Sequence, residues 1–174
     1  MIPLERILPE RPQFRGAFVD GRWKLAPRSS GKIVVQSPAN LEWTLPSLDY
    51  SFDLIDECLD SAKKAFKTWR ALPIEKRIQC LKRFAEQLDK RSTKIAQLVA
   101  LETGKPYEEA LGEVSLLSNK VHITLEDALK RIQTQFVDLG AQGRGSIHFQ
   151  PKGVMLVIGP FNFPVHLSHG HIVP

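Results

Sequence analysis

The chain has 174 residues, of which 43% are hydrophobic and 25% are charged, and its net charge is +5. This length corresponds to about one domain and allows a buried core. Lys and Arg alternate with Glu and Asp along helix-like segments, which favours a solvated helix face over a nucleic-acid-binding patch. No apolar run approaches the ~20 residues of a membrane span. We therefore expect neither nucleic acid nor a membrane as a partner.

The two cysteines, Cys58 and Cys80, are far apart and form no CxxC pair. Without a disulfide framework or zinc-finger spacing, a soluble protein of the reducing cytoplasm is expected. Both cysteines lie in amphipathic segments, where core packing is favoured over a reactive thiol. The opening MIPLERILPE has Glu and Pro where a signal peptide needs an apolar run.

Residues 1–50 are predicted to form a β-rich arm. The segment is rich in Pro, Gly and Ser and contains short β-like pieces such as GAFVDGRWKL. Its Asp20-Gly21 pair is typical of the two-residue turn of a β-hairpin.

Residues 53–136 are predicted to form a helical block, because hydrophobic residues recur there with the period of an α-helix. Gly104 is a natural helix stop, and Pro106 suits the first turn of the helix that follows. Four helices are expected, over about residues 53–69, 73–88, 94–102 and 106–132.

Residues 146–174 are predicted to contain strands and the start of another helix. After the turn-rich DLGAQGRG, the segment SIHFQ is typical of a strand. Five uninterrupted apolar residues, Val154–Ile158, indicate a second strand that is covered on both faces in a parallel sheet. The predicted class is therefore α/β: a β-hairpin, a helical block and the beginning of a Rossmann-like parallel sheet.

The segment GPFNFP, residues 159–164, directly follows this apolar run. Ligands of open α/β sheets bind beyond the carboxyl ends of the strands, so the segment is a candidate site. Gly159 allows the backbone to approach a ligand closely, and Pro160 fixes the turn. Asn162 has two possible roles. Its amide can donate a hydrogen bond to an oxyanion that develops at an attacked carbonyl carbon, or it can cap the helix that follows.

A metal site is the competing interpretation of three histidines near the end of the chain, His166, His169 and His171. No fourth ligand is apparent in the sequence, and helix positions three and five apart do not share one tight face. We therefore predict that no metal is bound.

Four segments, in this order, resemble the N-terminal part of the NAD(P)-dependent aldehyde dehydrogenase superfamily. They are FVDGRW, SAKKAFKTWR with the RIQCLKRFAEQLDKR that follows it, LETGKPYEEALGEV with the family's Glu-Thr-Gly-Lys-Pro signature, and PKGVMLVIGPFNFP. The likeness covers nearly the whole chain. The tail FNFPVHLSHGHIVP is similar to the succinylglutamate semialdehyde dehydrogenase branch of the family.

The resemblance implies an enzyme that oxidises an aldehyde, such as succinylglutamate semialdehyde, to the carboxylate. It implies NAD or NADP as the cofactor, with NAD favoured, and a homo-oligomer that is a dimer or a tetramer. It places Asn162 in the oxyanion hole and the backbone of Ile158, Gly159 and Pro160 along the dinucleotide. Phe161 would approach the nicotinamide side. Many members have Trp at that position, so the indole N–H is missing in this chain.

The family's nucleophilic cysteine and the glutamate that activates water lie beyond residue 174 in the family pattern. Neither Cys58 nor Cys80 matches the motif of the nucleophile. The chain is therefore interpreted as an N-terminal fragment of the cofactor-binding domain, over residues 1–174, without the catalytic domain. We expect this fragment to be inactive by itself. The alternative is a non-catalytic, truncated module that binds a partner subunit.

Overall fold

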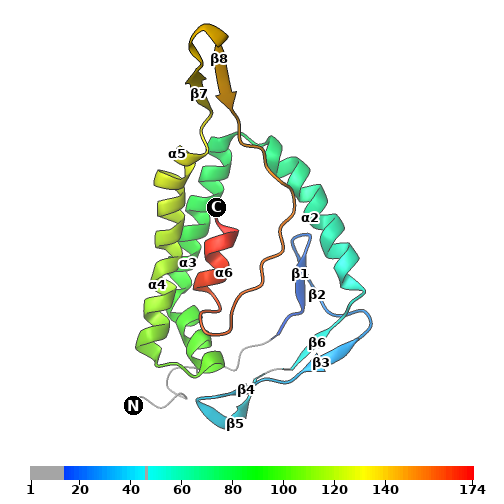
Figure 1. The fold of residues 1–174 in the computed structure, drawn as a ribbon. Coiled ribbons are helices and arrows are strands. Elements are labelled where there is room, and N and C mark those ends of the chain that lie inside the picture. Colours follow the sequence, from blue (N-terminus) through cyan, green and yellow to red (C-terminus); the bar gives the residue numbers. More distant parts are fainter. Residues whose placement is uncertain (1–13, 46) are drawn as a thin grey trace.

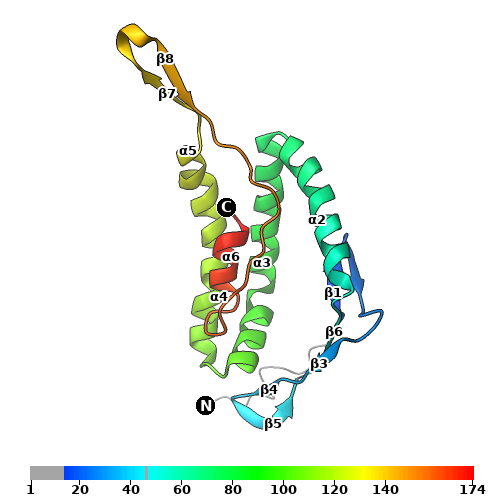
Figure 2. The ribbon, with the colours of Figure 1, turned by 45° about the vertical axis from the view of Figure 1, so that its right-hand side comes forward.

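The computed structural model describes residues 14–45 and 47–174, and the first 13 residues of the predicted arm lie outside the described residues. Small antiparallel pairs of strands precede and follow a group of helices (Figure 1). Helices α3 and α4 lie side by side, and the short α6 lies against α4 (Figure 2). This combination of helices and strands confirms the predicted α/β class.

From residue 14 on, the described part of the arm contains three antiparallel pairs of short strands. They are β1 (Ala17–Val19) with β2 (Arg22–Lys24), β3 (Gly31–Ile33) with β6 (Leu48–Tyr50), and β4 (Gln36–Ser37) with β5 (Asn40–Thr44). The predicted hairpin turn is confirmed: Asp20 has φ 51° and Gly21 has φ 73°, and positive φ at both central residues is typical of a type I′ turn. Ser37 fixes the arm to α3, because its buried Oγ donates to the carbonyl oxygen of Leu101.

The helices are fewer and longer than the sequence predicts. They are α2 (Leu54–Ala71), α3 (Ile74–Thr103), α4 (Tyr107–Ile123) continued by a π-helical turn η1 (Thr124–Ala128) and by α5 (Leu129–Arg131), and α6 (His166–Ile172). The prediction of separate helices over 73–88 and 94–102 is wrong. Helix α3 is continuous over 30 residues, because no Gly or Pro interrupts it. Within residues 14–45 and 47–174, every helix falls short of what a membrane crossing requires.

The core lies between α3 and α4. It consists of two clusters: Ala96, Val99, Ala100, Ala110, Val114 and Leu117 form the first, and Ala85, Val121 and Val173 form the second. Small alanines at this contact allow the two helices to pack closely. Helix α2 contributes no buried residue, and its hydrophobic side chains are half-buried or exposed, with Ile55 at 50%.

A hairpin of β7 (Gln135–Asp138) and β8 (Arg144–Ile147) projects beyond the helices (Figure 1). Strand β7 begins inside the segment predicted as helical, and β8 begins at Arg144 rather than at Ser146. The pairing of Asp138 with Arg144, across the turn η2 (Gly140–Gln142), sets both strand boundaries. A four-residue strand of this kind depends on its partner more than on its own sequence.

Val154–Ile158, predicted as a strand that is covered on both faces in a parallel sheet, has no strand partner among the described residues. The segment runs as an irregular stretch from β8 towards α6, and Leu156 is 83% exposed. A parallel strand needs hydrogen-bonding neighbours to satisfy its backbone. The sheets of the described residues are all antiparallel pairs, and none includes this segment.

Helix α4 offers a test of the fold at Gly112. The residue is exposed inside the helix, and a Cβ added there would meet no atom within 4 Å. Gly112→Ala should therefore raise the free energy of unfolding by about 0.5–1 kcal/mol, because alanine loses less backbone entropy on folding. The shift in the midpoint of urea unfolding, at an unchanged slope, measures this gain.

Gly104→Ala is the matched control and should destabilise the protein. Gly104 has φ 73°, and a Cβ added there would lie 2.9 Å from Cβ of Pro38. Equal effects of the two substitutions would contradict the assignment of Gly112 to a regular helix interior.

Candidate functional site

The sequence-predicted site residues, Ile158–Asn162, lie together on one exposed segment that leads into α6. Ile158 is 84% exposed and Phe161 is 90% exposed. Residues 161–165 form a turn, and α6 begins at His166. The segment is therefore an accessible loop, and its position depends on what holds it against the helices.

Asn162 does not cap α6. The N-cap position belongs to Val165, which makes no side-chain capping hydrogen bond. The backbone N–H groups of Val165 and His166 instead donate to Oε1 of Glu113, each over 3.1 Å. A carboxylate at this place accepts hydrogen bonds from N–H groups that a helix leaves unpaired, and its negative charge is stabilised by the positive end of the helix dipole. The helix-cap role considered for Asn162 is thus performed by a residue of α4.

Glu113 also forms an ion pair with Lys105, the middle residue of the three that connect α3 and α4. Nζ of Lys105 lies 2.7 Å from Oε2 of Glu113, and the side chains are 13% and 0% exposed, respectively. The same ammonium group donates to the carbonyl oxygen of Asn162 over 2.8 Å and lies 4.3 Å from the ring centroid of Phe163. A buried carboxylate is costly unless it is paired and hydrogen-bonded, and here it is both.

The LETGKP segment places Lys105 by ending one helix and starting the next. Gly104 adopts the left-handed conformation at the end of α3 and donates to the carbonyl oxygen of Ala100 over 2.9 Å. The N–H of Lys105 donates to Oγ1 of Thr103 over 3.3 Å, and Pro106 precedes the first residue of α4. The segment resembled a family signature in the sequence, and its structural role is a tight turn that directs a lysine towards the loop.

Sequence reasoning missed both Lys105 and Glu113. The signal for Glu113 was present: it lies on the stripe of Ala110, Val114, Leu117 and Val121, which is the buried face of α4. A carboxylate on an apolar stripe needs a cationic partner or several donors. No comparable local signal identifies Lys105, which is 57 residues from the loop that it contacts.

Gly159 lies against the first turns of α6. A Cβ added at this position would overlap Oγ of Ser168 and would lie 3.2 Å from its Cβ. Ser168 is held in turn, because its Oγ donates to the carbonyl oxygen of Pro164 over 3.0 Å. The missing side chain of Gly159 therefore lets the loop fold back closely onto α6.

The three histidines are not gathered at one point. His169 is buried, its ring nitrogen Nε2 lies 2.8 Å from the carbonyl oxygen of Leu117, and its ring packs against Phe84. Because a carbonyl only accepts, Nε2 carries the proton. His171 is exposed. In the part of the chain that the structure describes, no three His, Cys, Asp or Glu side chains form a group that could hold a metal ion.

Burial lowers the pKa of His169 below its usual value of 6.5; its hydrogen bond to Leu117 opposes this shift, and the charges of His166 and Lys120 add to it. Since the folded state takes up this proton later than the unfolded state, the neutral ring contributes its full stability above about pH 6.5. That contribution is lost as the pH falls towards the lower, folded-state pKa.

We predict that His169→Gln flattens the loss of stability between about pH 7 and about pH 5, because one proton uptake by the unfolded chain disappears. His171→Gln, at an exposed position of the same helix, is the control and should leave the profile as it is. Free energies of unfolding from urea titrations across this pH range measure both. A steeper acid loss in His169→Gln than in the unmodified protein would contradict the prediction.

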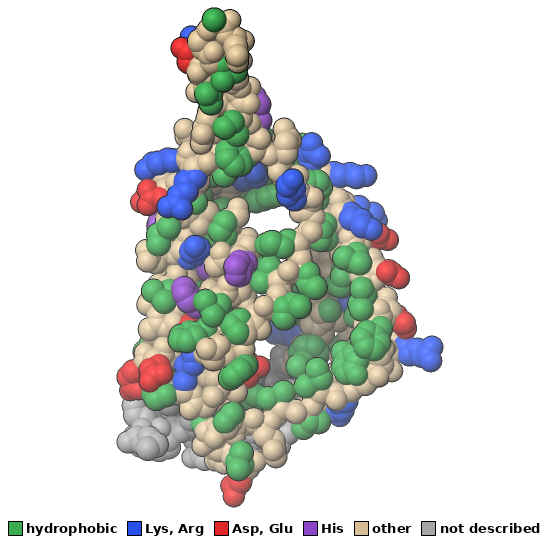
Figure 3. Space-filling view, viewed as in Figure 1, with side chains coloured by type: hydrophobic (Ala, Val, Ile, Leu, Met, Phe, Trp, Pro, Cys, Tyr) green, Lys and Arg blue, Asp and Glu red, His purple; other side chains and the backbone are tan. Residues whose placement is uncertain are grey.

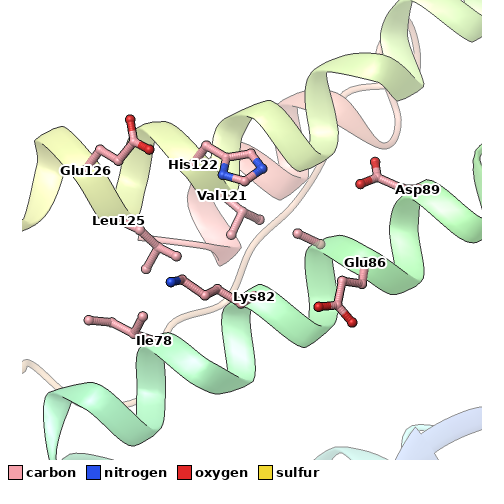
Figure 4. Close-up of a pocket in the computed structure, with 9 residues that line it drawn as sticks. Ile78, Lys82, Glu86, Asp89, Val121, His122, Leu125 and Glu126 are labelled. Atoms are coloured by element: carbon pink, nitrogen blue, oxygen red, sulfur yellow. The ribbon is translucent and has the colours of Figure 1, made fainter.

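A groove of about 670 Å³ lies between α3 and α4, away from the loop (Figure 4). It is about two turns further along α4 than Glu113, and residues 158–162 are not among those that line it. The lining residues are Ile78, Lys82, Ala85, Glu86, Asp89, Val121, His122, Leu125 and Glu126. The charged residues among them come from α3 and from η1, and the groove is separate from the candidate site.

Comparison with known proteins identifies the class. Residues 25–174 match the aldehyde dehydrogenase family, and the chain belongs to this family. Three of the four segments that carried the resemblance lie inside the match, and the FVDGRW hairpin lies before it. The resemblance to this family, inferred from the sequence, is confirmed.

Among individual relatives, the N-succinylglutamate 5-semialdehyde dehydrogenase of Hahella chejuensis is 35% identical over 160 residues, which are 91% of this chain and 32% of the relative. An NADP-dependent glyceraldehyde-3-phosphate dehydrogenase of Bacillus halodurans, complexed with NADP, has a TM-score of 0.79 at 30% identity over 90% of this chain and 34% of its own. An NAD-dependent benzaldehyde dehydrogenase of Corynebacterium glutamicum has a TM-score of 0.75 at 25% identity, over 87% and 33%. The chain thus spans about a third of each protein.

Proposed function

We propose that this chain forms the N-terminal part of the cofactor-binding domain of an NAD(P)-dependent aldehyde dehydrogenase. Family membership and the span of about a third of the relatives support this organisation. The exposed segment Val154–Ile158 supports it too, because its composition is that of a strand covered on both faces. In the complete enzyme this segment is the first strand of a parallel sheet, and the catalytic domain comes from elsewhere in the protein.

The observation that carries the proposal is the state of Asn162. Its loop is fixed by Lys105 and Glu113, while its amide is not used to cap α6. We propose that this amide donates a hydrogen bond to the oxygen of the attacked aldehyde. A donor held in place before the reaction stabilises the charge that grows there in the transition state.

The cofactor would lie along the exposed part of the same segment. Ile158 and Phe161 are accessible, and Gly159 lets the segment that bears them lie closely against α6. The backbone of Ile158, Gly159 and Pro160 would follow the dinucleotide, and Phe161 would form an apolar wall near the nicotinamide. A bound NAD(P) would supply the acceptor for the hydride that leaves the substrate carbon. Water supplies the second oxygen of the carboxylate.

We propose a semialdehyde as the substrate, with succinylglutamate semialdehyde favoured, and NAD favoured over NADP. The name of the Hahella chejuensis relative supports the substrate, and the two structural relatives support a nicotinamide cofactor of either kind. A homo-oligomer in the cytoplasm completes the proposal. Values of kcat/KM for N-succinylglutamate 5-semialdehyde, succinate semialdehyde and benzaldehyde, each with NAD and NADP, test the choice.

A second candidate function is a non-catalytic module that binds a partner subunit. Exposed apolar side chains favour it, since Phe136 is 76% and Leu156 is 83% exposed. Figure 3 shows hydrophobic side chains over much of the face on which α2 and the segment after β8 lie. One result would support this function over the enzyme. The 174-residue chain would be purified in a stoichiometric complex with a longer subunit, and the gene that encodes the chain would yield no product with dehydrogenase activity.

We predict that Asn162→Ala in the full-length enzyme lowers kcat for the aldehyde by about 10²–10³, or about 3–4 kcal/mol. The Kd of the cofactor should change little, because the dinucleotide would contact the backbone of Ile158 and Gly159. Asn162→Asp should be slower still, since a carboxylate repels the developing oxyanion. Steady-state turnover and cofactor titrations of the three proteins measure these effects. Near-normal turnover of Asn162→Ala would reject the proposed role.

A further inference from the structure

We propose that Lys105 and Glu113 are positioning residues that set the orientation of Asn162 for its role in the reaction. This inference rests on the proposed function, because it assigns the pair a task only if Asn162 touches the reacting aldehyde. Neither side chain would contact the substrate or the cofactor itself.

The pair holds the backbone at Asn162 and again at Val165 and His166, on either side of residues 163 and 164. On one side, Nζ of Lys105 donates to the carbonyl oxygen of Asn162 over 2.8 Å. On the other side, Oε1 of Glu113 accepts the N–H groups of Val165 and His166. The bond of 2.7 Å between Nζ and Oε2 joins the two anchors. The loop is thus held at both ends by one buried ion pair.

These anchors restrict the direction of the Asn162 side chain. Fixing the carbonyl oxygen fixes the plane of the peptide group that follows Asn162, and therefore limits its ψ. Pro164 restricts the backbone further along, because its ring locks φ. The ring of Phe163 lies beneath the ammonium group at 4.3 Å, which holds the intervening residue as well. The amide of Asn162 consequently projects from a backbone with little freedom.

The contact between α3 and α4 has an apolar core that does not include this pair. It is made by the apolar cluster of Ala96, Val99, Ala100, Ala110, Val114 and Leu117. Lys105 lies between the helices, and its Nζ bonds point to Glu113 and to the loop. The pair therefore serves the loop far more directly than it serves the helical core, and the two roles can be separated by experiment.

The first experiment measures kcat, the aldehyde KM and the cofactor Kd of full-length Lys105→Met and Glu113→Gln. We expect kcat to fall about 10- to 100-fold with KM and Kd nearly unchanged, because a misplaced donor weakens mainly the transition state. Lys105→Arg should recover part of the loss, since it restores a cation beside the carboxylate. Lys130→Met is the matched control, as it breaks an exposed pair with Asp127 and should leave kcat unchanged.

The second experiment places Lys105→Met in an Asn162→Ala background. If Lys105 acts through Asn162, the second substitution should lower kcat by less than about threefold more, since interacting residues are not additive. An undiminished loss in that background would overturn the inference. If kcat is unchanged in Lys105→Met or Glu113→Gln but falls strongly in Asn162→Ala, the positioning role of the pair is overturned. The proposed function of Asn162 then remains intact.

A third measurement tests the hydrogen bonds of the loop directly and does not depend on enzyme activity. Hydrogen exchange of the Val165 and His166 amides should become faster in Glu113→Gln and Lys105→Met, and should stay as it is in Lys130→Met. Equal protection in all variants would show that the pair does not hold the loop, and would overturn the inference. If Asn162→Ala keeps normal turnover while these amides lose protection in Lys105→Met, the proposed function fails and the anchoring by the pair remains.

Discussion

The buried carboxylate of Glu113 is the group on which the arrangement around the site depends. It lies on the apolar face of α4 with a fully covered side chain, so its charge must be balanced nearby. Lys105 supplies a cation, and the start of α6 supplies two N–H groups, those of Val165 and His166. Satisfying one carboxylate therefore brings together the turn after α3, the middle of α4 and a loop more than 50 residues further along.

Because of this requirement, the LETGKP turn does more than end α3 and start α4: it also positions the lysine that pairs with Glu113. Gly104 is needed because the chain turns in the left-handed conformation close to Pro38, and Pro106 starts the next helix without an N–H to satisfy. Between them lies Lys105, whose ammonium group contacts Glu113 and the loop. The backbone geometry of a helix connection and the electrostatics of the site are therefore parts of a single arrangement.

Local signals predicted the elements that local interactions determine. The type I′ turn at Asp20-Gly21, the end of a helix at Gly104 and the start of the next at Pro106 are properties of a few adjacent residues. The long α3, the β7 strand and the unpaired Val154–Ile158 are different, because continuity and pairing depend on residues far away. The same division applies to the site. The GPFNFP segment was visible as a pattern, whereas Lys105 could be recognised only once the fold had placed it beside Asn162.

The unpaired Val154–Ile158 segment has a consequence for biosynthesis. A parallel partner requires a crossover of a dozen or more residues, and ribosomes add about 5–20 residues per second. Leu156 and Ile158 are 83% and 84% exposed in this structure. In the complete enzyme proposed above, such an apolar run would stay unpaired on the nascent chain for on the order of a second, until a parallel partner is synthesised. Such a run is a favourable binding site for a chaperone on the nascent chain and a starting point for aggregation when none is at hand.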